Sequence, residues 1–330
     1  MDIRNIRQLK QTAQARLDNA RNADKIVLIY AGIITVLSLV VTAICYWLDS
    51  QISLQGGLSN MGKRTILSTL NLALPLISNF VIMCLELGFL AAMIRISRGL
   101  FTSEQTLRAG MSRFWAMIRA GLYMVANYCI TGIGSFYLAA MIFVFTPLSK
   151  GATAILEPLV ANIQNGTLVL ENAVAMELAQ AMIPMFILFG ILYAAAVIPM
   201  MYQYRMVNYV LLDKPHMGAM AAIRASKLMM HRNRFALFKL DLSLWWYYGL
   251  ALAVSLLCYG DMLLPLIGVT LPFSQDVSYF LFYGLYLAAQ FALYWFFRNR
   301  VGVTYALAYE ALKPKEEDSD GVVLGNIFQM

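Results

Sequence analysis

Residues 26–48 read IVLIYAGIITVLSLVVTAICYWL, a stretch without a single charged side chain. A helix of about 20 apolar residues crosses the ~30 Å hydrocarbon core of a bilayer and satisfies its own backbone hydrogen bonds there. The stretch is too long for the apolar region of a secretory signal, and a long charged segment precedes it. We therefore interpret it as an uncleaved transmembrane helix.

Five further apolar stretches follow, at residues 67–94, 118–145, 183–204, 237–258 and 277–297. The whole chain is 60% apolar and 13% charged, whereas soluble proteins have about 45–50% and about 25%. The sequence therefore predicts an all-α, polytopic membrane protein with six transmembrane helices. We expect residues 1–312 to form a single domain, and residues 313–330, which are acidic and polar, to be a disordered cytoplasmic tail.

The positive charges are distributed unevenly between the two sides of this topology. Of the 25 lysines and arginines, only Lys63, Arg64 and Lys150 fall in the alternate loops, and all others fall on one side. Basic residues collect in the cytoplasmic loops of membrane proteins. The distribution predicts a multi-pass protein of the cell membrane with both termini in the cytoplasm. It also accounts for the net charge of +7 without a nucleic-acid partner.

Three basic segments on the predicted cytoplasmic side have the pattern of amphipathic helices, at residues 1–25, 102–119 and 216–234. Thr102 is a candidate cap for the second of them. Such helices can lie in the headgroup layer, where each basic residue near anionic lipid contributes about 1 kcal/mol. They can equally pack on the ends of the transmembrane helices, and the pattern leaves both possibilities open.

Glu86 is the only acidic residue deep within a predicted transmembrane helix, about 12 Å of helix rise from Ile94. An ionisable residue at that depth must pair, take up a proton or face water, which makes it a functional candidate. Its alternative role is a hydrogen bond to a neighbouring helix. Glu86, Asn79 and Asn127 form our candidate intramembrane polar site, and amides at such positions more often join helices than bind ligands.

Basic residues near the cytoplasmic ends of the helices are candidate contacts for phosphate groups or lipid headgroups. These candidates are Arg205, Arg224, Lys227, Arg232 and Arg234. Alternatively, their charged ends only extend to the interface while their stems stay in apolar surroundings. The predicted partners are the lipid bilayer and its anionic headgroups, with a partner protein as a second possibility.

Residue sets that indicate catalysis or a cofactor are absent from the sequence. The two histidines, His216 and His231, form no HExxH motif, and no glycine-rich phosphate loop occurs. The four cysteines lie singly within apolar stretches, which indicates neither a disulfide framework nor a metal site. We therefore predict that the protein is not an enzyme and holds no cofactor or metal.

The third basic segment and the end of the chain carry a recognisable pattern. It consists of Tyr209-Val210-Leu211-Leu212-Asp213-Lys214-Pro215, Ala222-Ile223-Arg224-Ala225-Ser226-Lys227-Leu228-Met229, Phe235 to Ser243 with Trp246, and Tyr309-Glu310-Ala311-Leu312. This pattern resembles the bacterial integral membrane family called domain of unknown function 975. The resemblance implies a bacterial inner-membrane protein and supplies no activity. The family usually has a glycine after the methionine and a basic residue, whereas this chain reads Met230-His231-Arg232-Asn233.

Within this pattern, residues 226–233 are expected to form a helix with a basic face toward phosphates, while Leu228 and Met229 face the helix bundle. Taken together, the sequence predicts non-enzymatic handling or organisation of lipid or a small solute. The alternative is a membrane scaffold or regulatory subunit that docks a partner protein through its basic cytoplasmic helices.

Overall fold

The computed structural model describes residues 3, 5–20, 22–54, 61–164, 172–266, 268 and 272–313. Within these ranges the secondary structure is helical and includes no strand, which confirms the predicted all-α class. The chain divides into two compact units, residues 1–117 with 206–330 and residues 118–205. The single-domain organisation stays a prediction, and the proposed disordered tail beyond residue 313 lies outside the described residues.

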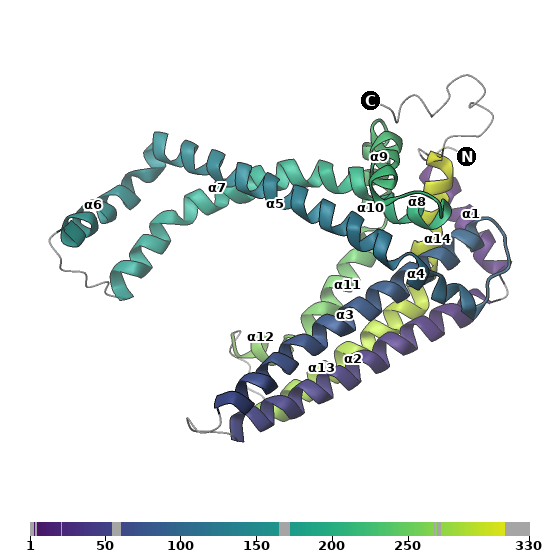
Figure 1. The fold of residues 1–330 in the computed structure, drawn as a ribbon, viewed down its shortest axis with the longest axis horizontal. Coiled ribbons are helices and arrows are strands. Elements are labelled where there is room, and N and C mark those ends of the chain that lie inside the picture. The colour runs from purple at the N-terminus through teal and green to yellow at the C-terminus, as the bar shows by residue number, and fades with distance from the viewer. Residues whose placement is uncertain are drawn as a thin grey trace. The chain divides into compact units, whose positions relative to one another are not determined.

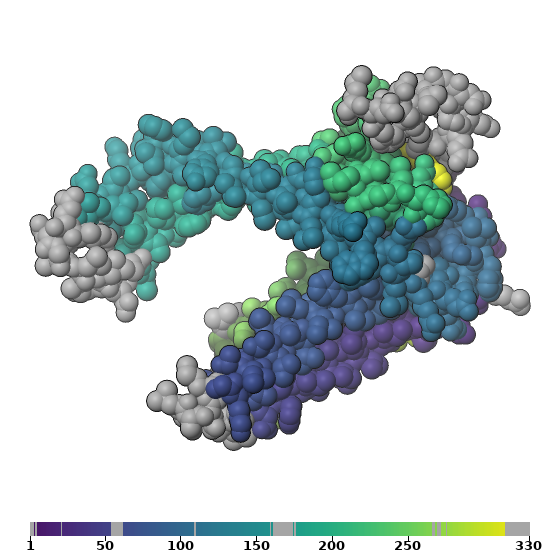
Figure 2. All heavy atoms as spheres, viewed as in Figure 1, coloured from purple at the N-terminus to yellow at the C-terminus, as the bar shows by residue number. Residues whose placement is uncertain are grey.

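Long apolar helices dominate the first unit. Helices α2 (Ala23–Leu54) and α3 (Met61–Ser97) lie side by side along their length (Figures 1 and 2). Helix α13 (Gln275–Leu293) also packs against α2 (Figure 1). Their outward side chains are apolar and exposed, as Val36 at 62% and Leu72 at 72% illustrate. A helix that exposes apolar side chains in this way is suited to a lipid environment.

In the described chain, five helices are long and apolar enough to cross a membrane, and a bent pair supplies a sixth candidate. The bent pair corrects the prediction of one continuous helix over residues 237–258. Helix α10 (Arg234–Ser243) and helix α11 (Trp245–Leu257) meet at an angle of 62°. Helix α11 alone has 13 residues, a rise of about 20 Å, which is shorter than a ~30 Å hydrocarbon core.

The most buried part of the first unit lies where the predicted cytoplasmic segments meet the ends of the long helices. Helix α1 (Ile6–Asp18), α8 (Val207–Asp213), α9 (Ala219–Met230) and α14 (Asn299–Leu312) gather there (Figure 1). Leu9, Met206, Ile223 and Tyr309 are almost fully buried. The apolar faces of α1 and α9 therefore pack on protein, the second of the two arrangements that the sequence left open.

The chain segment that follows the sixth apolar stretch is part of this core. Helix α13 continues through the π-helical turn η4 (Tyr294–Arg298) into α14, so that one helical path runs from residue 276 to residue 312. Val303, Ala306, Ala308 and Tyr309 of α14 are fully buried. The sequence analysis ended the sixth transmembrane helix at residue 297 and predicted no structure for the segment that follows.

The second basic segment also differs from its prediction as one helix capped by Thr102. Residues 104–108 form the 3-10 turn η2 (Glu104–Arg108), followed by the short α4 (Ala109–Ser112). A break at Arg113 then precedes α5 (Phe114–Phe145). We call residues 104–112 the roof segment, because they cover part of the C-terminal half of α3.

The second unit consists of the greater part of α5, the turn η3 (Pro147–Ser149), α6 (Lys150–Gln164) and α7 (Asn172–Tyr204). Aromatic pairs join α5 to α7, with ring centroids of Phe136 and Phe189 5.8 Å apart. Phe143, Ala152 and Met185 form a small buried cluster between the three helices. Helix α6 lies in what the sequence analysis treated as a loop.

Candidate functional site

Glu86 has the partners that its depth in α3 requires. Its Oε1 atom accepts a hydrogen bond from the Tyr30 hydroxyl at 3.4 Å and pairs with Nη2 of Arg298 at 3.3 Å. The Glu86 side chain is 48% exposed and the Arg298 side chain 28%. The acid therefore joins helices α2, α3 and the π-helical turn η4, and its charge is balanced within the protein.

Arg298 is surrounded by aromatic rings as well as by its acid. Its guanidinium carbon lies 5.5 Å from the centroid of Tyr294 and 5.8 Å from that of Phe89, within the range of cation–π contacts. Its Nη1 atom donates to the Tyr247 hydroxyl at 3.4 Å. Its Nε atom is buried and has no hydrogen-bond partner in the described chain. π-helical turns of this kind are frequent at functional sites.

Replacement of Glu86 with glutamine tests this pair. We expect the free energy of unfolding to fall by about 1 kcal/mol, because Arg298 keeps its charge and loses its counter-ion at a half-exposed position. Thermal unfolding in a neutral detergent measures the change. Glu177→Gln, at an exposed glutamate of α7, is the matched control. Identical melting curves for the wild type and Glu86→Gln would show that the pair contributes nothing.

A second polar cluster lies at the bend between α10 and α11. Asp241 accepts a hydrogen bond from the Tyr305 hydroxyl, whose oxygen is 2.5 Å from that of Tyr248. At the same bend, Lys10 Nζ of α1 donates to the carbonyl of Ser243 at 2.8 Å. Because the helix is broken here, the Ser243 carbonyl and the Asp241 carboxylate are available for contacts with other helices. They tie α1 and α14 to the broken fifth helix.

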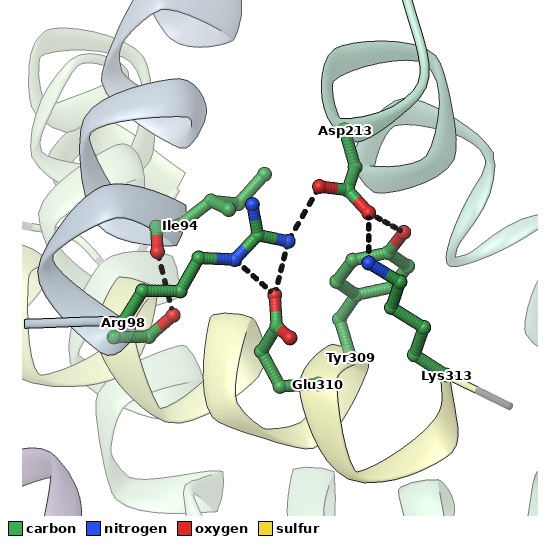
Figure 3. A network of polar contacts seen from close by, with 7 residues as sticks. Ile94, Arg98, Asp213, Tyr309, Glu310 and Lys313 are labelled. Atoms are coloured by element: carbon green, nitrogen blue, oxygen red, sulfur yellow. Dashed lines mark hydrogen bonds and ion pairs between the residues drawn. The ribbon is translucent and has the colours of Figure 1, made fainter. Parts of the chain in front are cut away.

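Residues from three distant segments form a third cluster, which we call the Asp213 network (Figure 3). Arg98 at the end of α3 reaches Asp213 of α8 and Glu310 of α14, each at 2.5 Å. Asp213 also accepts from the Tyr309 hydroxyl and from Lys313 Nζ, both at 3.0 Å. The Asp213 side chain is only 5% exposed. Two acids thus balance two bases, and the network holds α3, α8 and α14 together.

The electrostatics of the network keep Arg98 charged. Burial by itself would lower the pKa of the Arg98 guanidinium, and the hydrogen bonds to Asp213 and Glu310 outweigh that effect and raise the pKa above its ordinary value. Both acids belong to motifs that carried the family resemblance, Asp213 in the first and Glu310 in the last. The sequence did not indicate that these motifs meet.

The other predicted polar residues are placed as follows. Asn79 lies exposed on α3, two helical turns from Glu86. Asn127 belongs to the second unit, where its Nδ2 donates to the Tyr123 carbonyl of its own helix at 2.8 Å. The partners of Glu86 are therefore Tyr30 and Arg298, neither of which the sequence analysis selected, and not the two asparagines. Arg298 was counted there as an ordinary cytoplasmic charge.

The predicted headgroup contacts differ in exposure. Arg205, Arg224 and Arg232 are exposed, whereas Lys227 and Arg234 are partly buried. The Nε atom of Arg234 has no partner among the described residues, although other atoms of this side chain interact. The predicted orientation of α9 is wrong for Leu228, which is 60% exposed. Ile223, Ser226 and Met230 are the residues that face the core, because they share the buried helical stripe.

An apolar cleft of about 520 Å³ lies between α2, α3 and the roof segment. Ten of its twelve lining residues are uncharged, and the two charged ones are Glu104 and Arg108. Its walls include Ile29 and Ile33 of α2, Ile77 and Phe80 of α3, and Leu107 and Met111 of the roof segment. We call this hollow the α2–α3 cleft.

Two glycines bring the roof segment close to α3. A Cβ atom on Gly88 would lie 1.9 Å from the Leu107 carbonyl oxygen. A Cβ atom on Gly110 would lie 2.2 Å from the Cys84 carbonyl oxygen. Both contacts are with backbone, which cannot rotate away. Only glycine permits this approach, and small residues serve the same purpose between membrane helices generally.

A charged pair lies beside the cleft. Lys25 Nζ at the start of α2 lies 2.6 Å from Oε1 of Glu104, and both side chains are more than half exposed. Arg108 is exposed on the same turn. The cleft thus has an apolar interior and charged groups on the roof segment, an arrangement that suits an amphipathic ligand.

Metal-ligating side chains and thiols do not cluster in the part of the chain that the structure describes. No group of three or more His, Cys, Asp and Glu side chains lies close enough there to hold a metal ion. The four cysteines are free thiols. The cleft contains the thiol of Cys84 and the carboxylate of Glu104, but neither histidine of the chain lines it.

Comparison with known protein families gives a match over most of the chain. The family model described as "Protein of unknown function (DUF975)" matches residues 1–294. No curated protein and no solved structure matches the chain. The matched residues include the first three of the four quoted motifs, whereas Tyr309 to Leu312 lie beyond them. Because the match covers most of the chain, this polytopic helical protein belongs to the DUF975 family.

Proposed function

We propose that the protein binds phospholipid of the cytoplasmic leaflet in the α2–α3 cleft and organises it without chemical change. In this proposal the protein spans a bacterial inner membrane, with both termini on the cytoplasmic side. The basic segments define that side by the positive-inside rule. The cleft then opens into the inner leaflet, beside the cytoplasmic ends of α2 and α3.

The observation that carries the proposal is the cleft itself. Its volume of about 520 Å³ falls within the ~300–1,000 Å³ that is usual for small-molecule sites. Ile33, Ile77 and Phe80 line it and are 41%, 59% and 48% exposed. Apolar side chains that line a hollow on a lipid-facing surface favour a hydrocarbon ligand, because they gain contacts that a convex helix face does not offer.

The charges of the roof segment supply a place for a headgroup. Arg108 lines the cleft and can donate several hydrogen bonds to a phosphate in a fixed, planar geometry. Lys25 lies nearby through its pair with Glu104. Each basic residue close to an anionic surface contributes about 1 kcal/mol. These groups favour an anionic lipid over a neutral one.

A cleft-filling substitution tests this function. Ile33→Trp places a large ring in the cleft, and we expect the purified protein to retain less than half of the phospholipid that the wild type retains, since the ring occupies the acyl-chain volume. Native mass spectrometry from a mild detergent measures the bound lipid. Val36→Trp is the control, because Val36 lies one turn away on the same helix, is 62% exposed and does not line the cleft.

The possible results separate the proposal from its rival. Loss of lipid in Ile33→Trp alone supports the cleft. Equal lipid content in both variants and the wild type would overturn it. If a stoichiometric partner protein co-purifies with the wild type and is lost with Ile33→Trp, the cleft holds a protein segment. That result would favour a scaffold function, for which the sequence analysis had proposed the basic cytoplasmic helices as the docking site.

A further inference from the structure

A second, more polar hollow lies apart from the α2–α3 cleft in the same unit. Its volume is about 300 Å³, at the lower end of the ~300–1,000 Å³ range of small-molecule sites. Arg16, Asn19 and Asn22 line it from the end of α1 and the connection to α2. Residues 99–102, which follow α3, line the other side. We call it the Arg16 pocket.

The backbone at the end of α3 forms a closed turn that already satisfies its own carbonyl groups. The Gly99 amide donates to the Ile96 carbonyl and the Leu100 amide to the Arg95 carbonyl, both at 2.9 Å. Gly99 has a φ of +72°, the left-handed conformation that this helix ending requires. The Ile94 carbonyl accepts from Ser97 Oγ at 2.8 Å. The helix end therefore does not need a cation to cap it.

Arg16 nevertheless lies directly against this turn. Its Nη1 atom is 2.6 Å from the position that a Cβ on Gly99 would take, so the absence of a side chain at Gly99 makes room for the guanidinium. Among the described residues, Arg16 has neither a hydrogen-bond acceptor nor an acidic partner. A guanidinium whose donors are unused is suited to an oxyanion, which it can bind through two parallel hydrogen bonds.

Amide and hydroxyl groups surround this cation. Asn19 Nδ2 donates to the Ala15 carbonyl at 2.9 Å, and Asn22 Nδ2 donates to the Thr102 carbonyl at 3.4 Å. These bonds fix both amides and leave their Oδ1 atoms as acceptors. Thr102 is 3% exposed and adds a hydroxyl group to the wall. The pocket thus offers donors for an anion beside acceptors for hydroxyl groups.

We infer that the Arg16 pocket binds the phosphate ester of a small polyol, with the phosphate on Arg16 and the polyol hydroxyls on Asn19 and Asn22. The same chemistry occurs in a glycerophosphate lipid headgroup and in soluble glycerol phosphate. This site is separate from the lipid cleft of the proposed function, and it requires no acyl chain. Its binding therefore does not depend on whether the cleft holds lipid.

The experiment uses the full-length protein in nanodiscs of phosphatidylcholine, titrated with sn-glycerol 3-phosphate while the melting temperature is followed. We expect saturable stabilisation in the wild type. In Arg16→Gln the apparent Kd should rise about 10- to 100-fold, the effect of losing hydrogen bonds between a cation and an anion. Arg7→Gln is the matched control, because it removes the same charge from the same helix outside the pocket.

A second arm identifies the source of the ligand. Nanodiscs that contain phosphatidylglycerol replace the soluble ester, and the same three proteins are compared. Stabilisation by the soluble ester that Arg16→Gln weakens and Arg7→Gln retains supports a soluble ligand. The same pattern with phosphatidylglycerol alone supports a lipid headgroup. No stabilisation in either arm, or equal weakening by both arginine substitutions, would overturn the site. Neither outcome depends on the lipid count of Ile33→Trp.

Discussion

Gly88→Ala is expected to lower the free energy of unfolding by about 3 kcal/mol and to remove lipid from the α2–α3 cleft. The added methyl group would lie within 2.6 Å of three backbone atoms of Leu107, so no side-chain rotation relieves the overlap. The roof segment must move away from α3, and the cleft loses one wall. Thermal unfolding in detergent measures the first effect, and native mass spectrometry measures the second.

Gly32→Ala provides the control for this substitution. Gly32 lies within α2, and a Cβ atom there would meet no atom within 4 Å. Alanine should therefore be neutral or stabilise the helix by up to about 1 kcal/mol, since it has the higher helix propensity. Gly110→Ala should behave like Gly88→Ala, because its methyl group meets the Cys84 carbonyl oxygen. Equal melting temperatures for Gly88→Ala and Gly32→Ala would show that the roof does not pack closely on α3.

The long helices were predictable because a hydrocarbon-length apolar stretch has few alternative structures. Residues 26–48 and 67–94 lie within α2 and α3, and the helices extend beyond both predicted ends. The break at Leu244 was not predictable in the same way, because residues 235–248 around it contain neither proline nor glycine. Tertiary contacts at the bend, from Tyr305 to Asp241 and from Lys10 to Ser243, accompany that break.

The candidate sites were likewise predictable from the sequence only in part. Depth in the apolar stretch singled out Glu86, and the rule that such an acid requires a partner led to the expectation of a polar contact. The partner Arg298 follows 212 residues later, and no local pattern connects the two. No sequence motif marks Gly88 and Gly110 either, because their importance depends on a close backbone approach that only the folded structure shows.

Helix α1 illustrates what an amphipathic sequence pattern leaves open. Leu9 and Ala13 of α1 are buried in the protein, whereas Arg7 and Arg16 of the same helix are exposed. An apolar stripe reveals that one face is covered, but it does not reveal what covers it. Because protein contacts hold the apolar face of α1, the backbone that carries Arg7 and Arg16 is packed against the protein while their side chains face outward.

Asp213→Asn is expected to lower the free energy of unfolding by about 3 kcal/mol, because it removes the nearly buried charge around which the Asp213 network is built. Arg98, Tyr309 and Lys313 all direct donors at this carboxylate. An asparagine keeps one acceptor and adds an NH₂ group that faces these donors. Lys313 then loses its acidic partner, while Arg98 retains Glu310. Thermal unfolding in detergent measures the loss.

Glu310→Gln separates this effect from a general loss of charge. Glu310 is 28% exposed and, among the described residues, pairs with Arg98. Its replacement should therefore lower the free energy of unfolding by about 1 kcal/mol, as is usual for a pair near the surface. In the Asp213→Asn background, Lys313→Met should lower the free energy of unfolding by less than it does in the wild type, because the pair between Lys313 and Asp213 is already broken. Equal losses for Asp213→Asn and Glu310→Gln, or additive effects of Asp213→Asn and Lys313→Met, would mean that Asp213 is not the centre of the network. The connection of α3, α8 and α14 would then rest on apolar packing around Met206, Leu211 and Tyr309, all of which are buried whatever the charge of the acid.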